Sequence, residues 1–301
     1  MRLLTTLDEL RQARAEWARA GAAIGLLPTM GYLHEGHLAH AHAARAENDI
    51  VVASVFVNPT QFAPSEDLAR YPRDLPRDTA LLEGAGVDAI FAPTAEAIYP
   101  AGFNTWVEPS GPLTEQLEAA QRPGHFRGVA TVVTKLFTLV APARAYFGQK
   151  DAQQVAVVRR LIADLNLPVE LRVGPIIRES DGLAMSSRNV YLTGEHRAAA
   201  TTLYRALSAG RSAWESASPR AGGADGVRAA MRAVVTAEPL ATLDYAEVCD
   251  PDTCLPLGAL RAPALLAIAA RIGATRLIDN FLLRADGSWE IGRRRETNPP
   301  A

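Results

Sequence analysis

The stretch AAIGLLPTMGYLHEGHLAHAHAARAENDIVVASVFV, residues 22–57, decides the fold. It opens with a short apolar run over residues 22–27 that Pro28 stops, and a loop with glycine and histidine follows. Residues 36–48 then read as a helix, and residues 50–57 form a second, continuous apolar run. Continuous apolar strands are buried on both faces, so this order predicts two parallel strands joined by a crossover helix.

The same alternation of strand and helix extends on both sides of this stretch. The other predicted elements of the first half lie at residues 6–20, 74–83, 87–91, 131–140, 145–147, 152–164 and 169–173. Apolar strands separated by amphipathic helices are typical of a parallel sheet that is covered on both faces. The sequence therefore predicts a doubly wound α/β domain over residues 1–175.

The pattern changes after residue 175. Helices are predicted at residues 195–214 and 227–237, with a loop of small residues at 216–226 between them. The predicted strands follow at residues 245–248, 264–270 and 276–283. Two helices followed by three strands predict a second, smaller α+β domain over residues 176–290. The tail, residues 291–301, is expected to be disordered.

The composition is that of an ordinary globular chain. Its 301 residues carry a formal net charge of -2, so we expect no general attraction to nucleic acid or to an anionic membrane. No apolar run has the length of a membrane span. Cys249 and Cys254 are too few for a disulfide framework or a structural zinc site. We therefore expect a soluble protein of the reducing cytoplasm.

The two lysines of this chain are informative. Of its 31 basic residues, Lys135 and Lys150 are the only ones that are not arginine. The chain thus uses arginine wherever a solvated positive charge is sufficient. Because arginine cannot replace the compact, rotatable ammonium group at every site, a lysine here suggests a specific role.

The turn at residues 27–37, LPTMGYLHEGH, follows a predicted strand. Open α/β sheets bind ligands at the carboxyl ends of their strands. The helix that follows directs its free N–H groups and its positive dipole end at that edge, which favours phosphate. His34 and His37 lie three residues apart and can face the same way, so both imidazoles could donate hydrogen bonds to a polyphosphate.

The histidines of this segment also allow simpler interpretations. Four of the six histidines, His34, His37, His40 and His42, fall within nine residues. A metal site is conceivable, although imidazoles without a suitable carboxylate are an incomplete set of ligands. We expect His40 and His42 to be ordinary surface residues of the helix.

Two neutral amides, Asn58 and Gln61, follow the strand at residues 50–57. Such amides can hydrogen-bond the hydroxyl and carboxylate groups of a ligand. Asn58-Pro59 can also form a simple turn, which is the favoured interpretation of this segment taken by itself.

Residues 122–129, RPGHFRGV, read as a loop bracketed by glycines, with two cations and a histidine. The loop would suit an anion, and a solvated basic turn is the competing interpretation. Lys135, on the helix that follows, is expected to extend along or pair at the helix surface.

Residues 147–154, FGQKDAQQ, lie at the end of another predicted strand. Gly148 permits close approach of a ligand to the backbone, and Lys150 would place a point charge on phosphate. Gln154 lies one turn into the next helix and is expected to face the same crevice.

Residues 178–189, RESDGLAMSSRN, lie where the domain character changes. Two serines and Arg188 can clamp phosphates within a mobile loop, although a serine-rich turn is the usual explanation for such a segment. The position of this segment after the histidine turn supports the functional interpretation.

In this order the blocks, which span residues 28–192, resemble the pantothenate synthetase (pantoate–β-alanine ligase) family of the nucleotidyltransferase superfamily. The resemblance implies a Rossmann-type nucleotide domain with a smaller C-terminal domain, and a homodimer. It implies that ATP first activates pantoate as an acyl adenylate and that β-alanine then displaces AMP. The alternative is an adenylyl transferase of the same superfamily that acts on a different small acid.

The resemblance also implies roles for individual residues. His37 is expected to act as catalytic acid, with His34, Lys150 and Arg188 assisting, and Gln61 and Gln154 are expected to bind pantoate with support from Asn58. The expected ATP contacts are Met30, Gly31, Tyr32, Leu33, His34, Glu35, Gly36, His37, Gly148, Gln149, Lys150, Asp151, Ile177, Met185, Ser186, Ser187 and Arg188.

Magnesium is implied by this chemistry, but its ligands cannot be assigned from the sequence. Asp78 is the one carboxylate considered for that role. The remaining alternatives are a nucleotide sensor that binds ATP without turnover and a zinc protein built on the histidine cluster.

Overall fold

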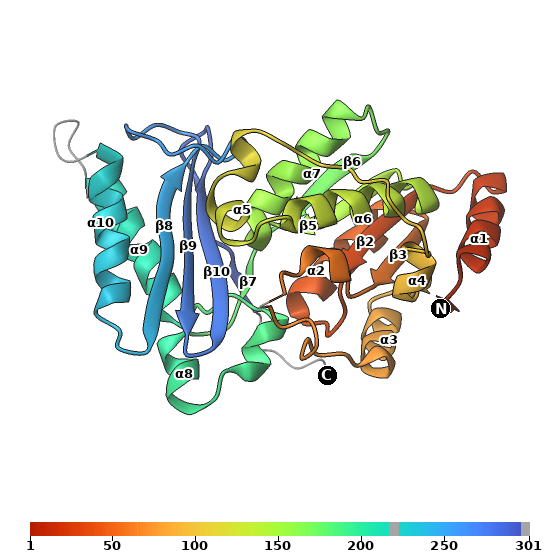
Figure 1. Ribbon diagram of the computed structural model, residues 1–301, viewed down its shortest axis with the longest axis horizontal. Helices are drawn as coiled ribbons and strands as arrows, with labels where there is room; N and C mark the ends of the chain where they lie inside the picture. The colour runs from red at the N-terminus through yellow and green to blue at the C-terminus, as the bar shows by residue number, and fades with distance from the viewer. Residues whose placement is uncertain (65, 217–222, 296–301) are drawn as a thin grey trace. The chain divides into compact units, whose positions relative to one another are not determined.

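A computed structural model of the chain describes residues 1–64, 66–216 and 223–295 (Figure 1). The chain divides into two compact units. The first comprises Met1–Thr114, Arg122–Gly148 and Gln154–Gly174. The second comprises Glu115–Gln121, Gln149–Gln153 and Pro175–Ala301. Two short segments that interrupt the first unit in the sequence therefore belong to the second unit.

The first unit is built on a six-stranded parallel sheet with the order β1-β4-β3-β2-β5-β6. Its strands are β1 (Arg2–Leu4), β2 (Ile24–Thr29), β3 (Ile50–Val55), β4 (Ala89–Phe91), β5 (Arg144–Gly148) and β6 (Glu170–Gly174). Its helices are α1 (Leu7–Arg19), α2 (Glu35–Glu47), α3 (Leu75–Gly84), α4 (Ala95–Ile98), α6 (His125–Val140) and most of α7 (Ala152–Asp164). The doubly wound α/β fold predicted from the sequence is confirmed.

The direction of the crossovers distributes these helices over the two faces of the sheet. Right-handed connections place α2 and α3 on one face and α1, α6 and α7 on the other. In agreement, α2 packs against α3, and α1 packs against α6. Because β3 and β5 lie on opposite sides of β2, the order of the strands reverses at β2, where folds of this type form their binding crevice.

Two element boundaries differ from the prediction. Pro28 was expected to end the strand, but β2 continues to Thr29. The paired residues of β2 with β5 are Gly25 and Leu26, so Pro28 needs no N–H group on that side. In addition, α6 begins at His125, six residues before the predicted helix, so residues 125–129 are helical and do not form a loop.

The second unit contains a four-stranded antiparallel sheet with the order β11-β10-β9-β8. Its strands are β8 (Ala241–Cys249), β9 (Ala264–Ile272), β10 (Thr275–Leu283) and β11 (Trp289–Glu290). The helices α9 (Thr202–Ser216) and α10 (Gly223–Thr236) pack on this sheet and share its apolar core, as Figure 1 shows. Shorter elements complete the unit: α5 (Leu117–Gln121), η3 (Gln149–Asp151), β7 (Ile177–Arg178), η4 (Ser187–Tyr191) and α8 (Gly194–Ala199).

Three predictions for this part of the chain need correction. The single helix predicted at residues 195–214 is divided into α8 and α9, since the chain turns at residues 200 and 201. Residues 223–226, predicted as loop, form the first turn of α10, whereas residues 217–222 lie outside the described residues. In the predicted disordered tail, Arg293–Arg294 form β12, whose backbone pairs in parallel with β7; residues 296–301 lie outside the described part.

Candidate active site

The first unit brings several predicted site residues to one edge of its sheet. Residues 30–37 follow β2, Asn58 and Gln61 follow β3, and Gly148 ends β5. These three strands are parallel neighbours, so their carboxyl ends meet. The side chain of Gln61 contacts that of Met30, with 3.2 Å between Nε2 and Sδ. The segments that the sequence predicted to share a site thus adjoin within this unit.

A buried carboxylate holds the turn after β2. The backbone adopts left-handed conformations at Gly31 (φ 82°) and Tyr32 (φ 49°). Asp78, from α3, accepts hydrogen bonds from the backbone N–H groups of Tyr32 (2.7 Å) and Leu33 (2.8 Å). A side chain at Gly31 would come within 2.9 Å of that carboxylate, so only glycine fits. Burial raises the pKa of Asp78.

Through these contacts Asp78 stabilises the turn after β2. They do not support a role for Asp78 as a magnesium ligand. Both of its oxygens are engaged by backbone N–H groups. Among the residues that the structure describes, no group of three or more His, Cys, Asp or Glu side chains is placed to hold a metal ion.

His34 and His37 cap the start of α2. The Nδ1 atom of His34 accepts from the N–H group of Gly36 (3.1 Å), and that of His37 accepts from the N–H group of His34 (3.3 Å). An accepting Nδ1 carries no proton, so in neutral imidazole the proton is on Nε2. The ring centroids lie 4.1 Å apart, which confirms that the two side chains share one face. The helix start therefore holds two imidazole rings in fixed orientations.

The other two histidines of α2, His40 and His42, differ in how exposed their side chains are. His42 is exposed, as predicted. His40 is only 8% exposed, and a methyl group added at Gly174 would come 2.2 Å from its ring. The prediction of a surface residue was wrong for His40, because the end of β6 covers it.

Asn58 fixes the orientation of the Gln61 amide. Asn58 Nδ2 donates to the carbonyl oxygen of Gly128 (3.2 Å), and its Oδ1 accepts from Thr60 and from the hydroxyl group of Tyr99. With Asn58 oriented in this way, Nδ2 also donates to Oε1 of Gln61 (3.0 Å). The amide nitrogen of Gln61 is therefore the end of this side chain that faces away from Asn58, and it donates one hydrogen bond to Sδ of Met30. Gln61 is 9% exposed.

The backbone of Gln61 is held by residues of the predicted anion loop. Arg122 forms a two-point ion pair with Glu66, at 2.7 and 2.8 Å, and its guanidinium group also meets Nε2 of His125 (3.1 Å). A guanidinium group only donates, so Nε2 accepts and Nδ1 of His125 donates to the carbonyl oxygen of Gln61 (2.8 Å). The positive charge of Arg122 is thus paired with Glu66 inside the protein. This pairing corrects the expectation that residues 122–129 form a loop that binds an anion or is solvated.

Lys135 lies on α6, the helix that begins at His125, and its side chain is half-buried. Its ammonium group lies 4.7 Å from the ring centroid of Phe103 and 5.5 Å from that of Tyr99. Burial lowers its pKa. The aromatic rings thus offset part of the cost of removing this charge from water.

Other predicted site residues belong to the second unit. Gln149, Lys150 and Asp151 form η3, and Ile177 lies in β7. The N–H group of Met185 donates to the carbonyl oxygen of Ile177 (2.9 Å), which brings these two residues together. The remaining residues of this group are Ser186, Ser187 and Arg188; the hydroxyl group of Ser186 caps η4 by accepting from Arg188 N–H (3.3 Å). Gln154, on α7, belongs to the first unit and is half-buried.

Sequence reasoning missed two buried polar residues of β10, Asp279 and Asn280. They are 3% and 2% exposed. Asp279 pairs with Arg178, next to Ile177, and Asn280 bonds the backbone of η3. A polar pair within an otherwise apolar strand was the signal that could have revealed them.

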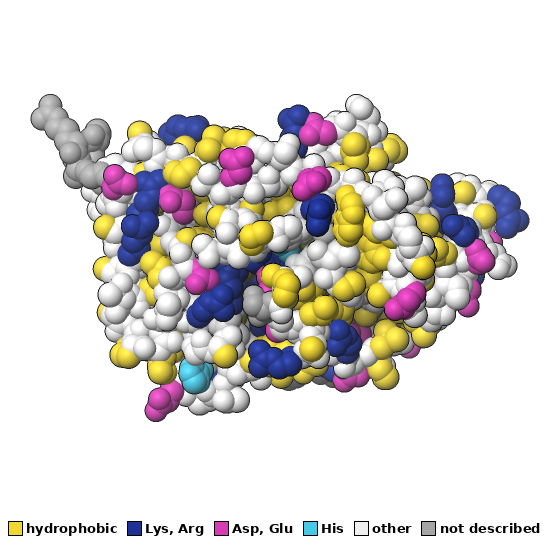
Figure 2. Space-filling model, viewed as in Figure 1, with side chains coloured by type: hydrophobic (Ala, Val, Ile, Leu, Met, Phe, Trp, Pro, Cys, Tyr) yellow, Lys and Arg dark blue, Asp and Glu magenta, His cyan; other side chains and the backbone are white. Residues whose placement is uncertain are grey.

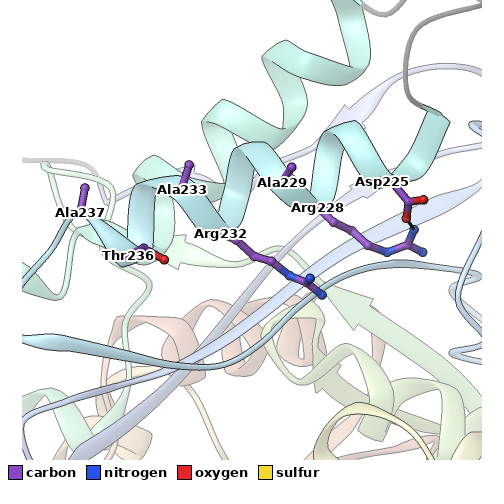
Figure 3. A pocket seen from close by; sticks show the side chains of 7 residues that line it. All are labelled: Asp225, Arg228, Ala229, Arg232, Ala233, Thr236 and Ala237. Carbon is purple, nitrogen blue, oxygen red and sulfur yellow. Dashed lines mark hydrogen bonds and ion pairs between the residues drawn. The ribbon is translucent and has the colours of Figure 1, made fainter.

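A hollow of about 730 Å³ lies elsewhere, along α10 (Figure 3). Its lining residues, which include Arg228 and Arg232, come from that helix and from Ala237, directly after its end. Arg228 bonds Asp225, Glu247 and the carbonyl oxygens of Val248 and Leu257. Its donors therefore serve the packing of α10 on the sheet. None of the predicted site residues lines this hollow.

Two general properties of the described residues bear on possible ligands. Acidic and basic side chains are interspersed on the face seen in Figure 2. Within the described ranges, no helix combines the length and apolarity needed to cross a membrane.

The sequence and the fold of this chain are similar to those of known pantothenate synthetases. The family model for pantoate-beta-alanine ligase matches residues 2–282. A pantothenate synthetase from Roseiflexus sp. (strain RS-1) is 60% identical over 285 residues, which cover 95% of this chain and all of that protein. A crystal structure of pantothenate synthetase from Thermus thermophilus superposes with a TM-score of 0.87 at 50% identity, over 97% of this chain and all of that one.

A more distant structure was determined with ligands. It is the pantoate-beta-alanine ligase from Francisella tularensis, described as complexed with beta-gamma ATP and beta-alanine. It is 33% identical, with a TM-score of 0.77, and the match covers 94% of this chain and 97% of that chain. By its matching family model and by relatives of this similarity, the chain belongs to the pantoate–β-alanine ligase family.

Proposed function

We propose that this chain condenses pantoate with β-alanine at the expense of ATP. In the first step, a carboxylate oxygen of pantoate attacks the α-phosphorus of ATP, and pyrophosphate leaves. In the second step, the amine of β-alanine attacks the carbonyl carbon of the adenylate, and AMP leaves with the oxygen of the former carboxylate. The products are pantothenate, AMP and pyrophosphate.

The observation that carries this proposal is the arrangement at the edge of the first sheet. A helix start with two imidazole donors lies after β2, and an oriented amide donor lies after β3. The helix start suits the phosphates of ATP. The amide nitrogen of Gln61 suits an oxygen of pantoate, and Gln154 is assigned to the same substrate. A neutral amide orients a carboxylate without the strong two-point pairing of an arginine, so the nucleophile stays reactive.

The first step brings two anions together, and positive groups must offset their repulsion. We assign this role to Lys150 and Arg188, together with the Nε2–H donors of His34 and His37. His37 also acts as the acid that supplies a proton to the leaving pyrophosphate. Alignment of the reactants can lower the barrier by roughly 7–11 kcal/mol, so a covalent enzyme intermediate is unnecessary.

The proposal includes Mg²⁺ as the partner of ATP. The described residues contain no cluster of carboxylates for a protein-bound cation. Mg²⁺ commonly keeps water and phosphate oxygens as ligands, so it would enter with the nucleotide and neutralise part of the triphosphate charge. By the same resemblance we expect the protein to be a homodimer and to act in the cytoplasm. Light scattering of the purified protein would test whether it is a dimer.

The decisive experiment mixes the purified protein with MgATP and pantoate and then adds β-alanine. We expect pyrophosphate to form with pantoate alone and free AMP to accumulate only when all three substrates are present. His37→Ala should abolish pantoate-dependent exchange between ATP and pyrophosphate. If pantoate is inert and another small acid supports pyrophosphate release, the chain is an adenylyl transferase with a different acceptor. ATP binding without any turnover would instead indicate a nucleotide sensor.

A further inference from the structure

Two adjacent polar residues interrupt the apolar strand β10. Asp279 and Asn280 are 3% and 2% exposed, although the neighbouring strand positions are mostly apolar. A buried polar group is costly unless it is hydrogen-bonded, so the partners of these two side chains indicate what the pair does.

Asn280 holds the backbone of η3. Its Nδ2 atom donates to the carbonyl oxygens of Gln149 (3.0 Å) and Lys150 (2.9 Å), and its Oδ1 accepts from Nε2 of Gln149 (3.1 Å). The side chain thus makes three bonds to two consecutive residues that are 131 and 130 positions away in the sequence. Both hydrogens of the amide nitrogen are used, so its orientation is determined by two backbone acceptors.

Asp279 holds the second predicted nucleotide segment of the same unit. Its carboxylate pairs with Arg178 at 2.6 and 2.9 Å, and both side chains are about 2% exposed. Arg178 also donates to the carbonyl oxygen of Gly182 (3.0 Å), within the loop that leads from Ile177 to Met185. Through Asp279 and Asn280, strand β10 is therefore hydrogen-bonded both to η3, which contains Lys150, and to β7, which contains Ile177.

We propose that Asn280 is a positioning residue for Lys150. Lys150 lies two residues beyond Gly148, the end of β5, and a long side chain is only as well placed as the backbone from which it extends. By fixing the carbonyl groups on both sides of the Lys150 α-carbon, Asn280 sets the point from which the ammonium group reaches the phosphates. This inference rests on the proposed function of Lys150 as a phosphate cation.

The chemistry required at position 280 is specific. Two carbonyl oxygens face the side chain, so it must supply two donors at one atom. A carboxylate has the same shape as the amide but would place negative charge against both carbonyl groups. Asn280→Asp therefore removes the positioning without creating a cavity, and Asn280→Ala removes it without adding charge.

The first measurement is steady-state exchange of pyrophosphate with ATP in the presence of pantoate. We expect both variants to lower kcat by about 100-fold, because a displacement of about 1 Å at a reacting group can have an effect of this size. The KM for pantoate should stay within about twofold of the parent, because Gln61 and Gln154 are untouched. Leu277→Ala is the matched control: Leu277 is 5% exposed on the same strand and packs in the core of this unit, so its loss tests destabilisation alone.

The second measurement reads the position of Lys150 without turnover. Since the chain has only two lysines, incorporation of lysine labelled with ¹³C at Cε gives two NMR signals, and Lys135→Arg assigns them. In the parent protein, addition of a non-hydrolysable MgATP analogue should shift the Lys150 signal. In Asn280→Asp and Asn280→Ala that shift should be lost or strongly reduced, whereas Leu277→Ala should retain it. Lys135 is the internal control.

The outcomes separate this inference from the proposed function. If the parent protein lacks pantoate-dependent exchange but Asn280 variants still lose the Lys150 shift, the proposed function fails and the positioning role stands. Folded variants with parental kcat and an unchanged Lys150 shift would overturn the positioning role. So would failure of both variants to fold, because Asn280 would then be needed for the fold itself.

Discussion

At the scale of single residues, the backbone determines which atoms a side-chain amide offers to a ligand. Asn58 must direct its nitrogen at the carbonyl oxygen of Gly128 and its oxygen at the N–H group of Thr60. This orientation makes Asn58 a donor to Oε1 of Gln61, and Gln61 in turn presents its nitrogen. The pantoate oxygen that we assign to Gln61 would therefore accept a hydrogen bond from this nitrogen.

This polarity predicts the effect of Gln61→Glu. The new carboxylate can still accept from Asn58, but it offers pantoate an anionic oxygen in place of an N–H donor. A hydrogen bond to a charged group contributes about 1.5–3 kcal/mol, so the KM for pantoate should rise about 10-fold to 100-fold. The KM for ATP should change little. Gln121→Glu, an exposed position on α5, is the control for added charge. Equal effects on both KM values would contradict the assignment.

Asp78 predicts a pH dependence of stability. Burial raises its pKa in the folded protein above the ordinary value. A raised pKa means that the folded protein binds this proton more tightly than the unfolded chain does. The contribution of Asp78 to the free energy of unfolding is therefore greatest at a pH below its ordinary pKa. It declines as the pH rises through the raised pKa. The free energy of unfolding of the parent minus that of Asp78→Asn, from urea titrations, should therefore fall with rising pH. A difference that grows with pH would refute this.

At the scale of elements, the position of Gln61 depends on the close packing of η1 (Pro59–Gln61) against α6. A methyl group at Gly128 would lie 2.4 Å from the carbonyl oxygen of Thr60 and 2.8 Å from the backbone nitrogen of Gln61. The first turn of α6 also carries His125, which donates to the carbonyl oxygen of Gln61. The backbone of Gln61 and the first turn of α6 are thus held together at main-chain distance.

Gly128→Ala should therefore displace Gln61. We expect a loss of about 1–3 kcal/mol in the free energy of unfolding, which is typical of overpacking, and a higher KM for pantoate. Gly84→Ala is the control, because a methyl group at this position of α3 meets no atom within 4 Å. That substitution should be neutral, or stabilising by up to about 1 kcal/mol. Parental stability and pantoate KM in Gly128→Ala would show that the packing is looser than described.

At the scale of the whole molecule, the strong bias toward arginine separates the two lysines from the other basic residues. Lys135 lies over the rings of Phe103 and Tyr99, where a guanidinium group can make the same type of contact. Lys150 is assigned to phosphate, for which a compact and rotatable ammonium group is needed.

Accordingly, Lys135→Arg should retain activity within about twofold, as expected for a substitution outside the site that keeps the charge. Lys150→Arg should lower kcat for pyrophosphate exchange by about 100-fold, because the larger planar group cannot occupy the same position. Near-parental exchange in Lys150→Arg would remove the requirement for lysine. A matching loss in Lys135→Arg would show that both positions tolerate arginine poorly for structural reasons.

Much of this molecule could be predicted from its sequence because the signals are local. Apolar runs and helical spacing predicted the parallel sheet, and the turn after residue 27 predicted a helix start with His34 and His37 on one face. Boundaries were less predictable where neighbours decide them: β2 tolerates Pro28 because of which residues pair with β5, and α6 begins early, at His125.

What the sequence by itself determined is the class of fold, the family, and the set of chemical groups available for a site. What only the tertiary structure decided is which atoms those groups present. The orientation of the Gln61 amide, the burial of His40, the role of Asp78 and the bonds of Asn280 all depend on partners distant in the chain. The physical reason is that hydrogen-bond polarity and burial are set by neighbours in space, which local patterns do not encode.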